Sequence, residues 1–338
     1  MQPTNRQWIL QARPAGPQID RAMFEKRESP LPHHVRDGEF LVRNRWFSCD
    51  PSQRAWMDAE TYLPPVALGQ TMRAFTGGEV VDSRHPGFKR GDLVTGLFGW
   101  QDYAVSDGRD ALGPVTKLAP GVELQSALSL FGITGMTAYF GLFEIGRPVA
   151  GDTVLVSGAA GATGVIAAQL ARLSGHRTIG IAGGADKCRW LVQELGLDEA
   201  IDYKAGNPME AVRALCPDGV NVYFDNIGGD MLDAGLANLA PGARVVLSGA
   251  LSGYGDFDQM PVIRHYPNLI LKRARMEGFL VFDYLARTAE AVTRMSPWLA
   301  AGQLSNPVDI AEGFDAAPDA LIRLFAGKNR GKQLVRLD

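Results

Sequence analysis

One stretch near the middle of the chain, residues 152–164, constrains the fold more than any other. It reads Asp-Thr-Val-Leu-Val-Ser-Gly-Ala-Ala-Gly-Ala-Thr-Gly. Residues 153–157 are β-branched or apolar and predict a short buried strand. Residues 165–175 follow the glycines and predict a helix that ends at Gly175. A strand, a glycine turn and a helix in this order are typical of a dinucleotide-binding unit, because a pyrophosphate can approach the free N–H groups of the helix.

The spacing of the glycines departs from the usual dinucleotide fingerprint. Gly158, Gly161 and Gly164 follow the pattern G-x-x-G-x-x-G, so Ala160 stands where the second glycine of a strict G-x-G-x-x-G would be. A glycine-rich turn can also serve only the close packing of a helix on a strand. The motif alone therefore leaves both interpretations open.

The remainder of the chain favours the dinucleotide interpretation, because strands and helices alternate after residue 151. We expect further strands at 177–182, 200–203, 220–226, 244–248 and 275–281, with helices at 185–195, 231–239 and ending near residue 299. This alternation predicts an α/β fold with a doubly wound parallel sheet. Residues 1 to about 125 instead show short strand-like runs between Pro, Gly and Asp turns, which predict a β-rich, barrel-like domain.

These patterns divide the chain into three segments. We expect a β-rich domain at 1–126, a dinucleotide-binding domain at 127–305 and a tail at 306–338 that returns to the first domain through a strand at 333–337. The apolar residues 127–143 are interrupted by glycine, serine and threonine. They predict a buried, broken helix rather than a membrane span.

Composition excludes several classes of partner. The 338 residues carry a net charge of −3 without a basic block, which argues against nucleic acid and anionic membranes. The first ten residues lack the apolar region of a signal peptide. The three cysteines are widely spaced, as in a reduced protein without disulfides. We therefore expect a cytoplasmic protein.

No metal site is expected. A catalytic zinc ion needs about three protein ligands. Cys49 lies in the first domain, but residues 68–78 contain no His or Cys, and the histidines, including His33 and His34, lack ligand spacing. The four-cysteine cluster of a structural zinc is also absent from the sequence.

The end of the second expected strand of the sheet favours NADP(H) over NAD(H). An NAD site usually has an acid there to hold the ribose hydroxyls. Here the strand ends at Gly183-Gly184, and the nearest cation is Lys187, which would attract a 2′-phosphate. Two alternatives stay open. Lys187 can be an ordinary solvated residue, and Asp186 can take the place of the acid.

Two later segments follow strands whose carboxyl ends should face the ligand. Asn226 is the last residue of the fourth expected strand, and residues 248–254 start at the end of the fifth. Asn226 can equally be a turn former. Tyr254 can equally be an aromatic residue whose hydroxyl lies at the surface.

Eight short segments together carry a resemblance to a known family: 50–54, 62–65, 85–92, 135–142, 159–164, 223–229, 275–279 and 327–332. They resemble the zinc-free medium-chain dehydrogenases/reductases, in the branch of the prostaglandin reductases (leukotriene B4 12-hydroxydehydrogenases) and NADP-dependent alkenal double-bond reductases. The resemblance covers nearly the whole chain. It implies a GroES-like catalytic domain built from both chain ends, a Rossmann domain and often a homodimer.

The resemblance also implies a function. We expect NADPH-dependent reduction of the C=C bond of an α,β-unsaturated ketone or aldehyde, by hydride transfer to the β-carbon. A quinone reductase and a non-catalytic NADPH-binding redox sensor remain as alternatives.

The NADP(H) contacts implied by the resemblance are Gly161, Ala162, Thr163, Gly164, Lys187, Tyr203, Asn226, Ser248, Gly249, Ala250, Leu251, Ser252, Gly253, Tyr254, Phe279, Leu280, Val281 and Asn329.

Tyr254 is also expected to be catalytic, as a hydrogen-bond donor to the developing enolate. It can instead only pack against the cofactor. Two positions depart from the family. Gly184 replaces a frequent serine, and Ser52 replaces an aromatic residue that shapes the substrate pocket, for which Ser52 and Tyr62 are the candidates here.

Overall fold

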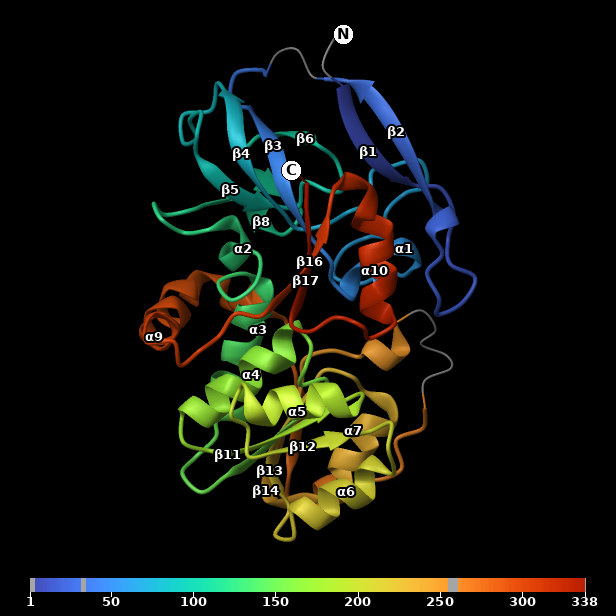
Figure 1. Cartoon of the computed structure of the whole chain (residues 1–338), viewed down its shortest axis with the longest axis vertical. Coiled ribbons are helices and arrows are strands. Elements are labelled where there is room, and N and C mark those ends of the chain that lie inside the picture. The colour runs from blue at the N-terminus through green and yellow to red at the C-terminus, as the bar shows by residue number, and fades with distance from the viewer. Residues whose placement is uncertain (1–3, 32–34, 255–260, 338) are drawn as a thin grey trace. The chain divides into compact units, whose positions relative to one another are not determined.

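The computed structural model describes residues 4–31, 35–254 and 261–337, and the chain divides into two compact units (Figure 1). Unit 1 comprises residues 1–129, 308–329 and 333–338. Unit 2 comprises residues 130–307 and 330–332. Within the described residues, no helix is long and apolar enough to cross a membrane.

Unit 2 is built on a six-stranded parallel sheet in the order β12-β11-β10-β13-β14-β15 (Figure 1). The strand order reverses between β10 and β13, which is where open α/β sheets bind ligands. The expected doubly wound parallel sheet is confirmed. Its strands are β10 (Thr153–Val156), β11 (Arg177–Ala182), β12 (Glu199–Asp202), β13 (Val220–Asp225), β14 (Leu239–Leu247) and β15 (Arg275–Gly278).

Helices pack on both faces of this sheet because its strand residues alternate between two apolar clusters. Val154 and Val156 of β10 belong to one cluster and Leu155 to the other, as the two-residue period of a strand requires. The helices of unit 2 are α3 (Ile133–Phe140), α4 (Ala162–Leu173), α5 (Ala185–Gln193), α6 (Pro208–Leu215), α7 (Gly229–Leu236), α8 (Asn268–Leu271) and α9 (Thr288–Ala300).

Two features of unit 2 differ from the sequence expectation. Helix α6 is not among the expected helices, although Asn207 caps its first turn (Oδ1 to Met209 N–H, 3.0 Å) and Pro208 is its first residue. The expected strand 275–281 ends at Gly278 and is followed by a 3₁₀ turn, Val281–Arg287.

The apolar stretch 127–143 is a broken helix, as expected. It joins α2 (Leu124–Ala127) to α3, which continues as a π-helical turn, Gly141–Gly146. A Cβ atom on Gly135 would lie 1.8 Å from the carbonyl oxygen of Leu130. This glycine is therefore required by the close passage of the chain over α3.

Unit 1 contains a seven-stranded, largely antiparallel sheet in the order β16-β17-β3-β4-β5-β9, with β6 also paired to β3. The C-terminal β17 lies beside β3, seen in Figure 1 as a red strand next to a blue one, with Val335 opposite Phe47. The strands of unit 1 are β1 (Thr4–Leu10), β2 (Phe24–Pro30), β3 (Phe40–Ser48), β4 (Thr76–Ser83), β5 (Leu93–Gly96), β6 (Tyr103–Ser106), β7 (Arg109–Asp110), β8 (Gly113–Pro114), β9 (Thr116–Lys117), β16 (Val308–Glu312) and β17 (Lys332–Arg336). Its helices are α1 (Ser52–Asp58), α2 and α10 (Ala317–Phe325).

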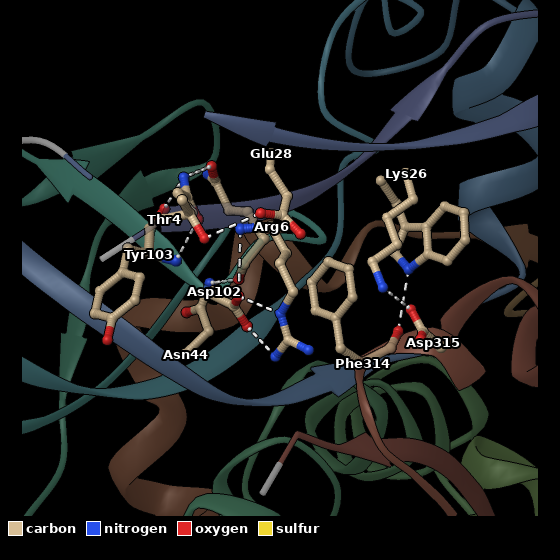
Figure 2. Close-up of polar contacts among 12 residues, drawn as sticks. Thr4, Arg6, Lys26, Glu28, Asn44, Asp102, Tyr103, Phe314 and Asp315 are labelled. Carbon is tan, nitrogen blue, oxygen red and sulfur yellow. Dashed lines mark hydrogen bonds and ion pairs between the residues drawn. The ribbon is translucent and has the colours of Figure 1, made fainter. Parts of the chain in front are cut away.

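The N-terminal ribbon β1–β2 is fastened to the C-terminal part of unit 1 around Phe314 (Figure 2). The Arg6 guanidinium lies 4.6 Å from the centre of the Phe314 ring, and the Trp8 indole donates to the Phe314 carbonyl at 3.0 Å. Arg6 also binds Asp102 through two guanidinium bonds of 2.7 and 3.0 Å and one backbone N–H bond of 3.2 Å. Asp102 thus reinforces the backbone bonds that hold the first strand in unit 1, such as those from Trp8 N–H to the Trp100 carbonyl and from Leu10 N–H to the Gln70 carbonyl.

We expect Asp102→Ala to lower the free energy of unfolding by about 2 kcal/mol, because it removes a bidentate ion pair and leaves the Arg6 N–H without its acceptor. The matched control is Asp315→Ala, which removes the exposed Lys26–Asp315 ion pair of 2.7 Å and should cost less than about 1 kcal/mol. Denaturant unfolding measures both. Equal losses would contradict the role given to Asp102.

Candidate cofactor-binding site

Most of the predicted cofactor residues gather at the carboxyl edge of the parallel sheet in unit 2. The glycine turn follows β10, Lys187 lies beyond β11, Asn226 follows β13, and residues 248–254 follow β14. Because parallel strands end at the same edge, these loops lie next to one another.

The glycine turn has the tight geometry that its sequence predicts. Gly158 has a φ of +59°, and a Cβ atom on Gly164 would lie 2.3 Å from the Gly158 carbonyl oxygen. Ala160 is buried in the core of unit 2, so its methyl group does not occupy the turn. Gly161 precedes α4, and the N–H groups of Ala162, Thr163 and Gly164 form the first turn, which has no intrahelical acceptors. The turn therefore fits a pyrophosphate despite the departure at residue 160.

Two returning segments brace this turn, and the sequence pattern does not reveal either contact. The Gly331 N–H donates to the Ala160 carbonyl at 2.8 Å. Gln169 of α4 accepts the N–H and the hydroxyl of Ser305 at 2.8 and 2.9 Å. Gly331 thus holds the turn before α4 and Ser305 holds the middle of the helix, although both are distant in the sequence.

A buried carboxylate lies beneath the turn. Asp225, the last residue of β13, is fully buried and accepts the Ser157 hydroxyl at 2.6 Å, the Tyr223 hydroxyl at 3.0 Å and the Gly228 N–H at 2.8 Å. Burial raises the pKa of Asp225 and that of Tyr223. The four groups link the end of β10 to the turn after β13.

Asn226 is held by the same network through both of its side-chain atoms. Its Nδ2 donates to the Ser157 carbonyl at 2.7 Å, and its Oδ1 accepts the Ser248 hydroxyl at 3.1 Å. Its side chain therefore connects the ends of three neighbouring strands, which is more than a turn former requires. The sequence shows Ser157 only as a small polar residue and Asp225 only as an acidic residue at strand ends, and it does not predict the bonds between them.

The described part of the loop after β14 runs to Tyr254. Its 3₁₀ turn, Leu251–Gly253, is tied to the β13 loop by the Ser252 hydroxyl, which donates to the Ile227 carbonyl at 2.7 Å. Tyr254 is half-buried, and burial raises its pKa above the usual range of a phenol. Its hydroxyl is therefore protonated at neutral pH and able to donate.

Two residues that we predict to contact NADP(H), Lys187 and Tyr203, follow neighbouring strands of the sheet. Lys187 is the third residue of α5, and Gly184 precedes the helix with a φ of +98°. Tyr203 follows β12 and is exposed. Asp186 forms an ion pair with Arg189, so its carboxylate is engaged on the surface of α5 itself.

The three residues predicted after β15 have different environments. Val281 is buried in the core, Phe279 is half-buried against Tyr284, and Leu280 is exposed.

The remaining predicted residues belong to unit 1. Ser52 is the first residue of α1, and Asn329 is buried. The rings of Tyr62 and Trp56 form an edge-to-face pair with their centres 6.3 Å apart. A pocket of about 300 Å³ in this unit is lined by residues that include Arg73, and neither Ser52 nor Tyr62 lines it.

The described side chains offer no group of three potential metal ligands. Cys49 is a buried free thiol. His33 and His34 lie outside the described residues.

We expect Asp225→Ala to lower the free energy of unfolding by about 3 kcal/mol and to weaken NADPH binding, because it leaves several buried donors without an acceptor. Tyr223→Phe removes only one of those donors and should cost about 1 kcal/mol. Thermal unfolding and NADPH titration measure the two effects. A loss in Asp225→Ala no larger than in Tyr223→Phe would show that the carboxylate does not organise the edge.

Comparisons with known proteins identify the family and the cofactor. A family model described as the N-terminal domain of oxidoreductase matches residues 6–113, and one described as zinc-binding dehydrogenase matches residues 162–300. The chain is 36% identical to the NADPH-dependent curcumin reductase of Escherichia coli, over 98% of this chain and 97% of that protein. It is 37% identical to the NADP-dependent 2-alkenal reductase of Nicotiana tabacum, over 88% and 87%.

The crystal structure of CurA from Vibrio vulnificus in complex with NADPH is similar to this chain, with a TM-score of 0.91 and 38% identity over 98% of this chain and 99% of that one. The chain thus belongs to the zinc-free medium-chain dehydrogenases/reductases, with a GroES-like and a Rossmann domain, and is an oxidoreductase that uses NADP(H).

Proposed function

We propose that this protein reduces the C=C bond of α,β-unsaturated ketones and aldehydes with NADPH, without a metal ion. The observation that carries the proposal is the likeness, over nearly the whole chain, to a curcumin reductase and a 2-alkenal reductase. Curcumin and 2-alkenals share a C=C bond conjugated to a carbonyl group, so the proposed substrate class is what their chemistry has in common.

The chemistry asks two things of the chain. NADPH, when bound, supplies the hydride that the β-carbon accepts. The protein must hold the cofactor and must stabilise the negative charge that develops on the substrate oxygen. A solvent-connected group then protonates the α-carbon.

Tyr254 is the residue we propose for charge stabilisation. Its loop is anchored to the β13 loop, and its hydroxyl is protonated at neutral pH, so it can donate a hydrogen bond to an enolate oxygen.

The cofactor contacts we propose are residues 161–164, Lys187, Tyr203, Asn226, 248–254, 279–281 and Asn329. The network of Ser157, Asp225 and Ser248 orients Asn226 and supports this assignment. Ser52 and Tyr62 are proposed for the substrate pocket.

We expect Tyr254→Phe to lower turnover of an enone about a hundredfold, because a single oxyanion donor is worth on the order of 3 kcal/mol. NADPH affinity should change little. The loss should be constant from about pH 6 to 9, because the raised pKa of Tyr254 keeps its hydroxyl protonated throughout. Tyr266→Phe, which alters an exposed tyrosine before α8, is the matched control.

Unchanged turnover in Tyr254→Phe with a saturating enone would remove the residue from catalysis. If Tyr254 only packs on the cofactor, Tyr254→Ala should weaken NADPH binding while Tyr254→Phe does little.

A substrate panel separates the alternative functions. Turnover of enones and enals supports the proposal. Turnover of quinones alone would favour a quinone reductase, and NADPH binding without turnover of any member would favour a redox sensor.

We also propose that two copies associate through the β15 edge of unit 2. β15 is the last strand of the sheet, and all four of its residues are exposed. Beside it in the sequence, Ile270 and Leu271 are 77% and 69% exposed. An exposed strand edge next to exposed apolar side chains is the kind of surface that a second copy can cover.

We expect the double variant Ile270→Asp/Leu271→Asp to shift the protein from dimer to monomer in sedimentation experiments, because charges in a buried apolar interface are costly. Val149→Asp places the same charge on another exposed apolar residue of unit 2 and should leave the dimer intact. A monomeric wild-type protein would refute the proposal.

A cytoplasmic location is proposed from the cysteines. All three are free thiols, and burial raises the pKa of Cys188 and of Cys216. Unpaired cysteines are typical of reducing compartments.

A further inference from the structure

An acid does lie at the edge where the cofactor's adenosine end is expected, although not on β11. Asp202 is the last residue of β12 and is in register with Ala182, the last residue of β11. A carboxylate at this edge usually binds the ribose hydroxyls of NAD and opposes a 2′-phosphate. Its presence in an NADP(H)-dependent protein therefore needs an explanation.

The contacts of Asp202 supply one. A single oxygen, Oδ1, accepts the N–H of Gly184 at 2.8 Å and the N–H of Lys204 at 3.0 Å. The first bond fixes the residue that precedes α5, which carries Lys187. The second fixes the turn that follows β12. One oxygen atom thus joins the two loops that flank this corner of the sheet.

The Lys204 side chain lies close to the Gly183-Gly184 loop. A Cβ atom on Gly183 would lie 2.9 Å from the Tyr203 ring and 3.0 Å from Cε of Lys204. The Lys204 Nζ lies 6.0 Å from the centre of the Tyr203 ring. Glycine at position 183 therefore makes room for both side chains.

The charges at this corner favour an anion. Lys187 belongs to the first turn of α5 and Lys204 follows β12, and among residues 4–31, 35–254 and 261–337 no carboxylate forms an ion pair with the Lys204 ammonium group. Asp202 directs Oδ1 at backbone N–H groups, which reduces the repulsion that its charge exerts on a phosphate.

We propose that Lys204 is a second cation of the adenosine 2′-phosphate subsite, beside Lys187, and that Asp202 is the positioning residue that joins their two loops. Asp202 then assists NADP(H) binding instead of opposing it. The inference depends on the binding of NADP(H) and not on the proposed reduction of enones.

The first test measures binding to the full chain by calorimetry, with NADPH, NADH and adenosine 2′,5′-bisphosphate as probes. Lys204→Met should weaken NADPH and the bisphosphate about three- to tenfold, the range for an exposed charge-assisted contact, and NADH less than about twofold. The loss should shrink at high salt. Lys187→Ala measures how much NADPH affinity is lost when one cation is removed, for comparison with Lys204→Met.

Lys272→Met is the matched control. Lys272 accepts the Gly242 N–H at 2.7 Å through its carbonyl and lies before β15, at the amino edge of the sheet. Its variant should bind all three probes like the wild type. Equal weakening of NADPH and NADH by Lys204→Met, or no weakening of either, would overturn the role of Lys204.

A second pair of variants tests Asp202. Asp202→Asn keeps an acceptor oxygen at Oδ1 and removes the charge, so it should bind NADPH at least as tightly as the wild type. Asp202→Ala removes the acceptor and should weaken NADPH about tenfold and NADH much less. An Asn variant as weak as the Ala variant would overturn the positioning role.

Should Asp202→Ala fail to fold, the Asn variant still decides, because binding weaker than wild type contradicts the proposal. The outcome is independent of the proposed reaction. If the variants show the expected binding pattern but the protein does not turn over enones, only the proposed reaction is refuted. If the protein turns over enones but Lys204→Met binds all probes like the wild type, only this inference is refuted.

Discussion

The cofactor edge of this protein depends on one buried carboxylate. Asp225 accepts donors from Ser157, Tyr223 and Gly228, and these bonds join the end of β10 to the turn after β13. A buried carboxylate is stable only when such donors surround it. Because the network closes on Asn226 and Ser248, the loops of three neighbouring strands behave as one support.

The parallel sheet and the glycine turn could be predicted from sequence because their signals are local. Short apolar strands, glycine spacing and the stop at Gly175 each arise within a few residues. Helix α6 was harder, because its apolar face is short and its clearest signal is the Asn207-Pro208 start. The ribbon β1–β2 was harder still, because β2 is largely charged and exposed and is defined by pairing with β1.

The supporting residues of the site could not be predicted for a different reason. Asp202 reads as a strand-end acid, and its effect depends on which N–H groups its oxygen meets. Gln169 and Gly331 likewise act through partners more than a hundred residues away. Sequence spacing carries no information about such contacts. The resemblance to the family supplied the expected ligand contacts, whereas the structure supplied the hydrogen bonds that hold those residues in place.

The placement of β17 has a consequence for synthesis of the chain. β17 lies between β16 and β3, so the part of β3 that β6 does not cover, Trp46–Ser48, has no partner on that side until β17 has been synthesised. The same segment delivers Gly331 to the dinucleotide turn. Both units are incomplete until these residues have been synthesised, and an unpaired strand edge of this kind is prone to aggregation during that time. Both units can therefore close only after Gly331 and β17 have been synthesised.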